Sequence, residues 1–201
     1  MPDAGWAGLR DELIAMAERD DAVRSGLASD GSLFDGYHPT MRVVHDAHAR
    51  RMAAILDAHG WPGEPQVGEA GARAAWVLVQ HAIGHPRLQR IALEAMRRSA
   101  ACGHLPALFP AMLEDRIRTL EGRPQRYGTQ YDWDREGRLS PSPLEDEANV
   151  DQRRAGLGLP PLADETARRR HAAAAEGERP PADWVARRAV MARWLRETGW
   201  R

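Results

Sequence analysis

The sequence predicts a mainly α-helical protein: a single-domain helical bundle over residues 1–201, with a loop or short β-hairpin inserted at about 123–145 and further helices after it. Three observations predict this class. Apolar residues recur at helical spacing through most of the first 121 residues, where Gly and Pro separate the segments. The insert lacks that period, which returns near the C-terminus. The 201 residues, 43% of them hydrophobic, suffice for one core.

The first predicted helix covers about residues 7–23, because Leu9, Leu13 and Met16 recur on one face. A loop is expected over 24–40, where glycines and turn signals gather. The second predicted helix covers about 41–59.

The second predicted helix carries histidines on its apolar face. Spacings of three and four residues place a continuous stripe there, made of Met41, His45, His48, Met52, Ile55 and His59. These histidines either line a partly open groove or bind polar partners in the core. Gly60 is expected to end the helix.

The segment 67–85 (VGEAGARAAWVLVQHAIGH) is expected to form a third helix surrounded by other helices, because its second half is almost wholly apolar. Gln80 and His81 interrupt it, and a buried polar pair needs hydrogen-bond partners. A buried imidazole can give or take a proton near neutral pH. His81 is therefore the predicted centre of the site. The alternative is a core histidine bonded to a carboxylate or carbonyl.

Two further helices precede the insert. Pro86 suits the first position of a helix over about 86–101, with His85 near its N-cap. A fifth helix is expected over about 107–121, although Pro110 leaves its start open.

The insert and the C-terminal segment have their own signals. QYDWD, a turn at Arg135-Glu136-Gly137, and RLSPSP predict a short β-hairpin. A short helix is expected next, and then two helices at about 164–177 and 181–198.

Four phrases together resemble the signatures of a bacterial family of unknown function. They are HGWP (59–62), VGEAGARAAWVLVQHA (67–82), PQRYGTQ (124–130) and PLEDEANVDQRRAGLGLPPL (143–162). The resemblance covers a core of about residues 9–162 and leaves 163–201 as a C-terminal extension. It implies a shared fold and a shared polar site, without an activity. Family members often carry an amide where His48 stands, and an acid near His85.

The loop RYGTQ supplies three candidate ligand-binding groups, Tyr127, Thr129 and Gln130, around a glycine that permits a tight bend. They either orient a polar ligand or pin the irregular segment to the bundle. Asp115 and Arg116, on the fifth predicted helix, are further candidates, because carboxylates and arginine forks bind polar ligands. Surface ion pairing is the alternative for them.

The sequence does not predict a metal site, although some of its histidine spacings would allow one. The pairs His45/His48 and His81/His85 have spacings that can hold a metal. However, Gly84 and Pro86 should break the helix before His85, and there is no HExxH pattern. No cofactor is predicted either.

Composition excludes several classes of chemistry. All 28 basic residues are Arg, so Schiff-base, pyridoxal-phosphate and P-loop lysine chemistry are absent. The single cysteine forms no internal disulfide, and GxSxG and GxGxxG motifs are missing. The net charge of −1 argues against nucleic acid. Without an apolar run of membrane length or a signal peptide, a cytoplasmic protein that binds no membrane is expected.

The sequence favours a small, cofactor-independent enzyme that uses histidine acid/base chemistry on a polar small molecule, in bacterial specialised metabolism. His81, His48 and Tyr127 would be catalytic. Gln80, His45, Thr129, Gln130, Asp115 and Arg116 would bind substrate. Two alternatives stay open: a non-catalytic binding or scaffold protein with structural polar groups, and a metalloprotein that uses histidine and carboxylate ligands. A homodimer is also considered.

Overall fold

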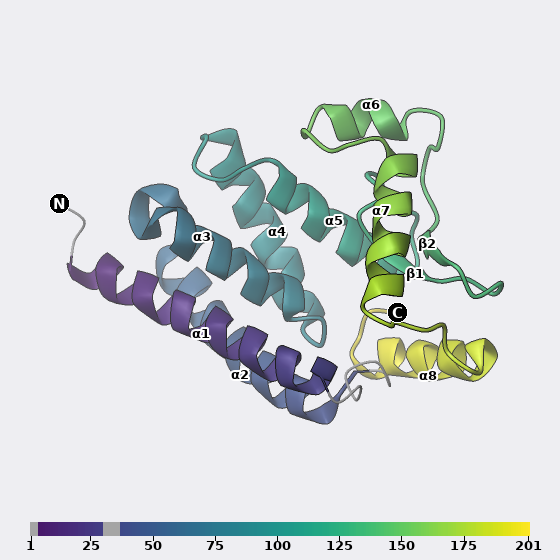
Figure 1. Cartoon of the computed structure of the whole chain (residues 1–201). Coiled ribbons are helices and arrows are strands. Elements are labelled where there is room, and N and C mark those ends of the chain that lie inside the picture. Colours follow the sequence, from purple (N-terminus) through teal and green to yellow (C-terminus); the bar gives the residue numbers. More distant parts are fainter. Residues whose placement is uncertain (1–3, 30–36) are drawn as a thin grey trace. The chain divides into compact units, whose positions relative to one another are not determined.

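The computed structural model describes residues 4–29 and 37–201. Over these residues the chain is mainly α-helical, as predicted, with one antiparallel two-stranded hairpin (Figure 1). The elements in order are α1 (Ala4–Ser29), α2 (Pro39–His59), α3 (Glu64–His81), α4 (Pro86–Ala101), α5 (Leu108–Leu120), β1 (Tyr131–Trp133), β2 (Leu139–Pro141), α6 (Val150–Ala155), α7 (Leu162–Ala175) and α8 (Trp184–Glu197).

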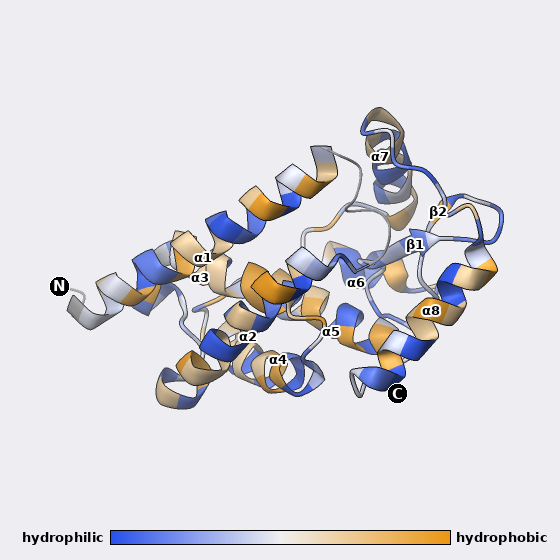
Figure 2. Ribbon diagram, turned by 90° about the horizontal axis from the view of Figure 1, so that it is seen from below, coloured by the Kyte–Doolittle hydropathy of each residue, from blue (hydrophilic) through white to orange (hydrophobic). Residues whose placement is uncertain are grey.

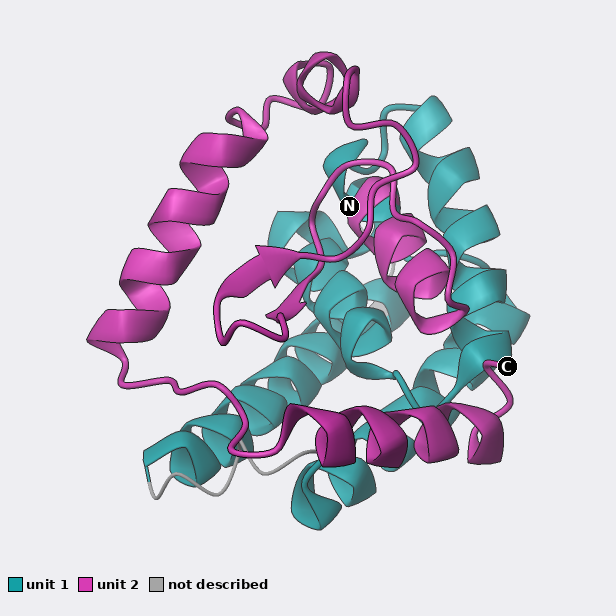
Figure 3. Ribbon diagram, turned by 90° about the vertical axis from the view of Figure 1, so that its right-hand side faces the viewer, with its two compact units in different colours: residues 1–110 teal, residues 111–201 magenta. Residues whose placement is uncertain are grey.

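The chain divides into two compact units, residues 1–110 and 111–201 (Figure 3). They are called unit 1 and unit 2 below, and each is described by itself. The single domain expected from the sequence stays a prediction.

Unit 1 is a bundle built around α3. Helix α1 packs against α2 and α3, and α4 also packs against both of those helices. The centre of the bundle consists of fully buried apolar side chains, among them Leu13, Met52, Ile55, Leu78 and Met96. Burying each such side chain stabilises the fold by about 1.5–3 kcal/mol relative to leaving it in water.

Helix α1 is longer than its sequence pattern predicts. It continues to Ser29, so the loop expected from residue 24 is wrong for its first six positions. The sequence there lacks a proline, and once a helix is formed each added residue gains a backbone hydrogen bond. The strongest turn signals of that predicted loop fall in residues 30–36, outside the described part of the chain.

Helix α2 confirms both the predicted stripe and the predicted stop. Five of the six stripe residues are buried, and His59 at the far end is exposed. Gly60 has a positive φ of 72°, and its backbone N–H donates to the carbonyl of Leu56. The helix therefore turns His45 and His48 inward together with the apolar residues.

Helix α3 ends earlier than the predicted segment. His81 is its last residue, and a turn through Ile83 and Gly84 leads into α4. Within α3, Gly68 adopts a φ of 68° that breaks the regular helix near its start. His85 is the N-cap of α4 and Pro86 its first residue, as predicted.

Unit 2 is held together by polar contacts around the predicted hairpin. Tyr131 pairs with Pro141 across the two strands. The indole N–H of Trp184, on α8, donates to the carbonyl of Trp133 at 2.9 Å, and Arg187 pairs with Asp132 at 2.7 Å. Helix α8 alternates hydrophobic and hydrophilic residues along its ribbon (Figure 2). Across the described residues, no helix is both long enough and apolar enough to cross a membrane.

Candidate functional site

The candidate site in unit 1 is centred on a buried carboxylate, Asp20, whose exposed fraction is 1%. Its Oδ1 lies 2.7 Å from Nδ1 of His81, and its Oδ2 lies 3.0 Å from Nε2 of His45. The three side chains come from α1, α2 and α3, so helix packing brings them together. Asp20, His45, His48 and His81 are called the Asp20 cluster below.

Helix periodicity explains how Asp20 reaches the core. Leu9 and Leu13 are buried on α1, and Asp20 follows Leu13 by seven residues, or about two helical turns. Asp20 therefore lies on the same buried side of α1 as these leucines. Asp20 was not among the predicted site residues, although an acid in register with a buried leucine stripe was a usable signal.

The C-terminal end of α3 presents His81. The buried side chain of Gln89 donates to the carbonyls of Val79 and Gln80 and so satisfies backbone groups at that end. The side chain of His81 is 32% exposed, whereas the adjacent Gln80 is buried.

The carboxylate of Asp20 stays ionised in this setting. Burial raises its pKa, but the His45 and His81 rings beside it outweigh that effect and hold the pKa well below its ordinary value. An ionised carboxylate next to a ring N–H fixes which nitrogen of the histidine carries the hydrogen.

His45 contacts polar groups on both sides of its ring. The hydroxyl of Tyr37 lies 2.9 Å from Nδ1 of His45, and the two rings are stacked with centroids 5.6 Å apart. Burial, with a further contribution from Asp46, raises the pKa of Tyr37. Tyr37 therefore stays a neutral phenol that can donate to His45 or accept from it.

His48 lies next to the carboxylate without bonding to it. Its Nδ1 is 4.0 Å from Oδ2 of Asp20, and the residue is buried. Burial lowers the pKa of His48, although Asp20 opposes the shift. A neutral ring is therefore favoured there.

Three buried atoms of the cluster lack an aligned hydrogen-bond partner among the described residues: Oδ2 of Asp20, Nε2 of His45 and Nδ1 of His48. Asp20, His45 and His81 also offer ligand atoms that all lie within 4.8 Å of one another. The arrangement can thus hold a proton, a polar ligand or a metal ion.

Two other acidic residues of unit 1, Asp46 and Glu69, lie outside this cluster. Asp46 accepts a 2.8 Å contact from Nε2 of His85, and its other oxygen lies 3.8 Å from Arg42. Glu69 is exposed. His85 is therefore paired with Asp46 and not with His81.

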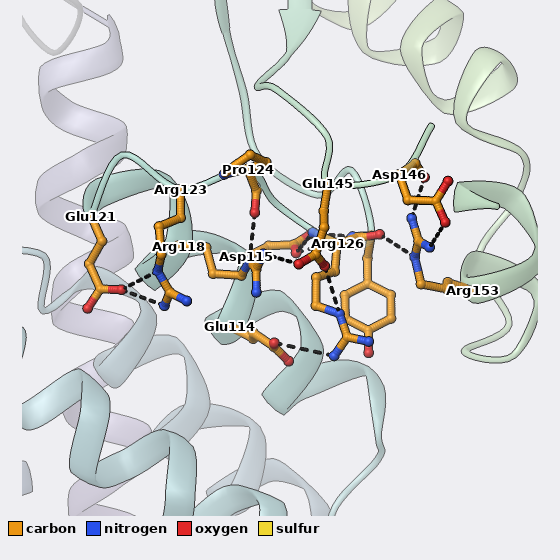
Figure 4. Close-up of polar contacts among 11 residues, drawn as sticks. Glu114, Asp115, Arg118, Glu121, Arg123, Pro124, Arg126, Glu145, Asp146 and Arg153 are labelled. Atoms are coloured by element: carbon orange, nitrogen blue, oxygen red, sulfur yellow. Dashed lines mark hydrogen bonds and ion pairs between the residues drawn. The ribbon is translucent and has the colours of Figure 1, made fainter. Parts of the chain in front are cut away.

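The predicted residues of unit 2 form a separate network around Asp115, which has no exposed surface. Its carboxylate accepts from the backbone N–H groups of Arg126, Tyr127 and Thr129 at 2.7 to 3.2 Å, and from the Thr129 hydroxyl at 3.0 Å. Figure 4 shows Asp115 beside Arg126. Burial raises the pKa of Asp115, and these backbone hydrogen bonds oppose it. Both oxygens of Asp115 therefore accept hydrogen bonds from the loop.

The rest of the loop is bonded in the same way. The side chain of Gln130 donates to the Thr129 hydroxyl, and its backbone N–H donates to the side chain of Gln125. The Arg126 guanidinium lies 5.6 Å from the ring centre of the half-buried Tyr127. Arg116 is half-buried on α5. These contacts favour the alternative in which the loop's polar groups pin it to the helix.

Arg154 is a structural residue that was not predicted from the sequence. It is 1% exposed and donates to the carbonyls of Tyr127, Gly128 and Pro160. Asp115 and Arg154 therefore bind the same bend from its N–H side and its carbonyl side. Nothing in the sequence around Arg154, which precedes the GLGLPP segment, indicates that its side chain is buried.

The structure brings His45, His48 and His81 together in unit 1 and adds Asp20 to them. Tyr127, Thr129, Gln130, Asp115 and Arg116 belong to unit 2.

A family model described as "Family of unknown function (DUF6624)" matches residues 7–186. The match extends past residue 162, where the four phrases end, and takes in α7 and the start of α8. No curated protein and no solved structure matches the chain.

Proposed function

The chain belongs to this family of unknown function, and we propose that it is an enzyme that moves protons on a polar small molecule. His81 is the acid/base and Asp20 is the residue that positions it. The observation that carries the proposal is the 2.7 Å contact between a fully buried carboxylate oxygen and Nδ1 of a histidine whose side chain is 32% exposed.

The chemistry follows from the two ring nitrogens of His81. When Nδ1–H donates to Asp20, Nε2 is the nitrogen that accepts a proton from a bound molecule or returns one to it. The carboxylate also stabilises the imidazolium that forms when Nε2 takes the proton. A positioned acid/base of this kind accelerates a reaction by about 10²–10⁴-fold.

The other members of the cluster support this role. His48 is buried and favours the neutral ring, so it is a candidate to accept a hydrogen bond from a ligand. His45, between Tyr37 and Asp20, helps to hold the carboxylate ionised. Asp115 and Thr129 are left out of the proposal, because their polar groups bind within the loop.

The remaining expectations stay predictions from the sequence. They are the absence of a cofactor, a cytoplasmic location, a role in bacterial specialised metabolism, a homodimeric state and no binding to nucleic acid.

Turnover of a mixed pool of compounds tests the proposal even though the substrate is unidentified. Wild-type protein is incubated with a mixture of polar metabolites, and mass spectrometry measures which components change. We expect at least one component to be converted, and His81→Ala to reduce that conversion by about 10²-fold or more.

His104→Ala is the matched control, because His104 is an exposed histidine of the same unit. It should keep the wild-type conversion. Equal conversion by folded His81→Ala protein would show that His81 is not the acid/base.

A further inference from the structure

We propose that Asp20, His45 and His81 form a binding site for a divalent transition-metal ion. This inference goes beyond the proposed proton transfer and does not depend on it. It concerns which ion the cluster holds, and it can be measured without a substrate.

The spacing of the ligand atoms fits such an ion. Metal–nitrogen and metal–oxygen bonds in zinc sites are about 2.0–2.2 Å long, so ligand atoms on one ion lie at most about 4.4 Å apart. The three residues offer atoms within 4.8 Å of one another, and the nitrogens of His45 and His81 that face the carboxylate lie 3.0 and 2.7 Å from its oxygens. Small side-chain adjustments suffice to close the cluster around an ion.

A second observation points to a missing ligand. Oδ2 of Asp20, Nε2 of His45 and Nδ1 of His48 are buried without an aligned hydrogen bond in the described part of the chain. All three residues are more than nine-tenths buried. Buried polar atoms are normally paired, and an unpaired one destabilises the fold. A bound cation would give the carboxylate oxygen and the His45 nitrogen a partner at the same point.

The donor set indicates the class of ion. Two imidazoles and one carboxylate suit Zn²⁺, Fe²⁺ and related transition metals, whereas Mg²⁺ and Ca²⁺ prefer oxygen ligands alone. His48, 4.0 Å from the carboxylate, is the nearest further nitrogen donor. Water or this histidine would complete the coordination.

Metal binding would change what His81 does. A histidine nitrogen must lose its hydrogen before it binds a metal, so an ion bound at Nδ1 replaces the hydrogen bond to Asp20. The remaining ring hydrogen then sits on Nε2, which can donate a proton but cannot accept one. The metal-free and metal-bound forms therefore have different chemistry at the same residue.

Zinc titration of the full chain tests the inference. Protein dialysed against a chelator and then freed of it is titrated with zinc chloride in a calorimeter. We expect one ion per chain, a higher melting temperature with zinc, and a loss of affinity of at least about tenfold in His45→Gln. His104→Gln, an exposed histidine of the same unit, should bind zinc as the wild type does.

Two results would overturn the inference: no zinc binding by the wild type, or His45→Gln protein that binds zinc like the wild type. Circular dichroism checks that the variants are folded. If His45→Gln does not fold, the visible absorption spectrum of wild-type protein with cobalt(II) tests the site instead. A spectrum of hydrated cobalt contradicts the site, and bands of a four- or five-coordinate ion support it.

The zinc and turnover experiments fail separately. If the wild type does not bind zinc but His81→Ala loses turnover, the metal site is overturned and the proposed function stands. If the wild type binds zinc and His81→Ala keeps its turnover, the metal site stands and the proposed function is overturned.

Discussion

Asp20 in unit 1 and Asp115 in unit 2 are both buried carboxylates, at 1% and 0% exposure, but they have different partners. Asp20 faces the rings of His45 and His81. Asp115 faces three backbone N–H groups and one hydroxyl of the loop that follows α5. The partners of Asp20 can change protonation, and the backbone partners of Asp115 cannot.

This difference separates a structural site from a chemical one. Backbone N–H groups are permanent donors, so Asp115 has one arrangement in which every group is satisfied. Each nitrogen of a histidine donates or accepts according to the tautomer, so the Asp20 cluster has several possible arrangements of its hydrogen bonds. A site that can rearrange its hydrogens is suited to proton transfer or to binding a metal ion.

The largest effect should come from Asp115→Asn. Both oxygens of Asp115 accept from backbone N–H groups, so an amide NH₂ in either position faces another donor. We expect a loss of about 3 kcal/mol in the free energy of unfolding, the upper range for a buried group without a partner. Urea denaturation measures it.

The neighbouring Glu114→Gln is the control for this variant. Glu114 is 3.5 Å from a partly exposed Arg126, and removing such a pair should cost less than about 1 kcal/mol. If Asp115→Asn is no less stable than Glu114→Gln, the loop is held by other contacts.

Asp20→Asn should be tolerated better, at about 1 kcal/mol in the presence of a chelator. The amide NH₂ can donate to Nε2 of His45 once that ring carries its hydrogen on Nδ1, where the Tyr37 hydroxyl can accept it. The same urea experiment compares the two aspartates. A cost equal to that of Asp115→Asn would show that the histidines do not rearrange.

The smallest effect concerns Glu165, a carboxylate on α7 that pairs with two arginines. Hydrogen bonds from Arg168, and then from Arg169, outweigh burial and lower the pKa of Glu165 to about 2 from an ordinary 4.5. Because its folded pKa is lowered, Glu165 stabilises the fold above about pH 4.5, and this contribution is lost as the pH falls toward 2.

Glu165→Gln should therefore flatten the acid part of the stability curve. The arginines are 66% and 35% exposed, so we expect a difference of less than about 1 kcal/mol between the variant and the wild type at pH 6. Unfolding free energies between pH 2 and pH 6 measure the difference. Parallel curves for the two proteins would contradict the ion pairs.

Much of the fold follows from local sequence signals. Gly60 and the His85-Pro86 pair mark helix ends that lie where they are predicted. The end of α1 was missed because nothing in residues 24–29 forbids a helix or requires one. The division into two units depends on contacts between distant segments, which local patterns do not report.

The candidate site was predicted in part. The histidine stripe of α2 showed that His45 and His48 point inward, and the apolar surroundings of His81 showed that it needs a partner. Asp20 was not predicted, because the sequence around it does not show that the acid is buried against histidines from two other helices. The burial of Asp115 and its loop partners depend on segments 11 to 14 residues away, which local sequence patterns do not show.

The hydrogen on His81 tests the central claim most directly. A long-range ¹H–¹⁵N NMR spectrum of the chelator-treated protein at pH 7 reports which ring nitrogens carry hydrogen, and His81→Gln identifies the signals. We predict a hydrogen on Nδ1 of His81, bonded to Asp20, and a changed Nδ1 signal in Asp20→Asn. An Nδ1 without hydrogen in the wild type, or a His81 signal indifferent to Asp20→Asn, would contradict the Asp20–His81 pair.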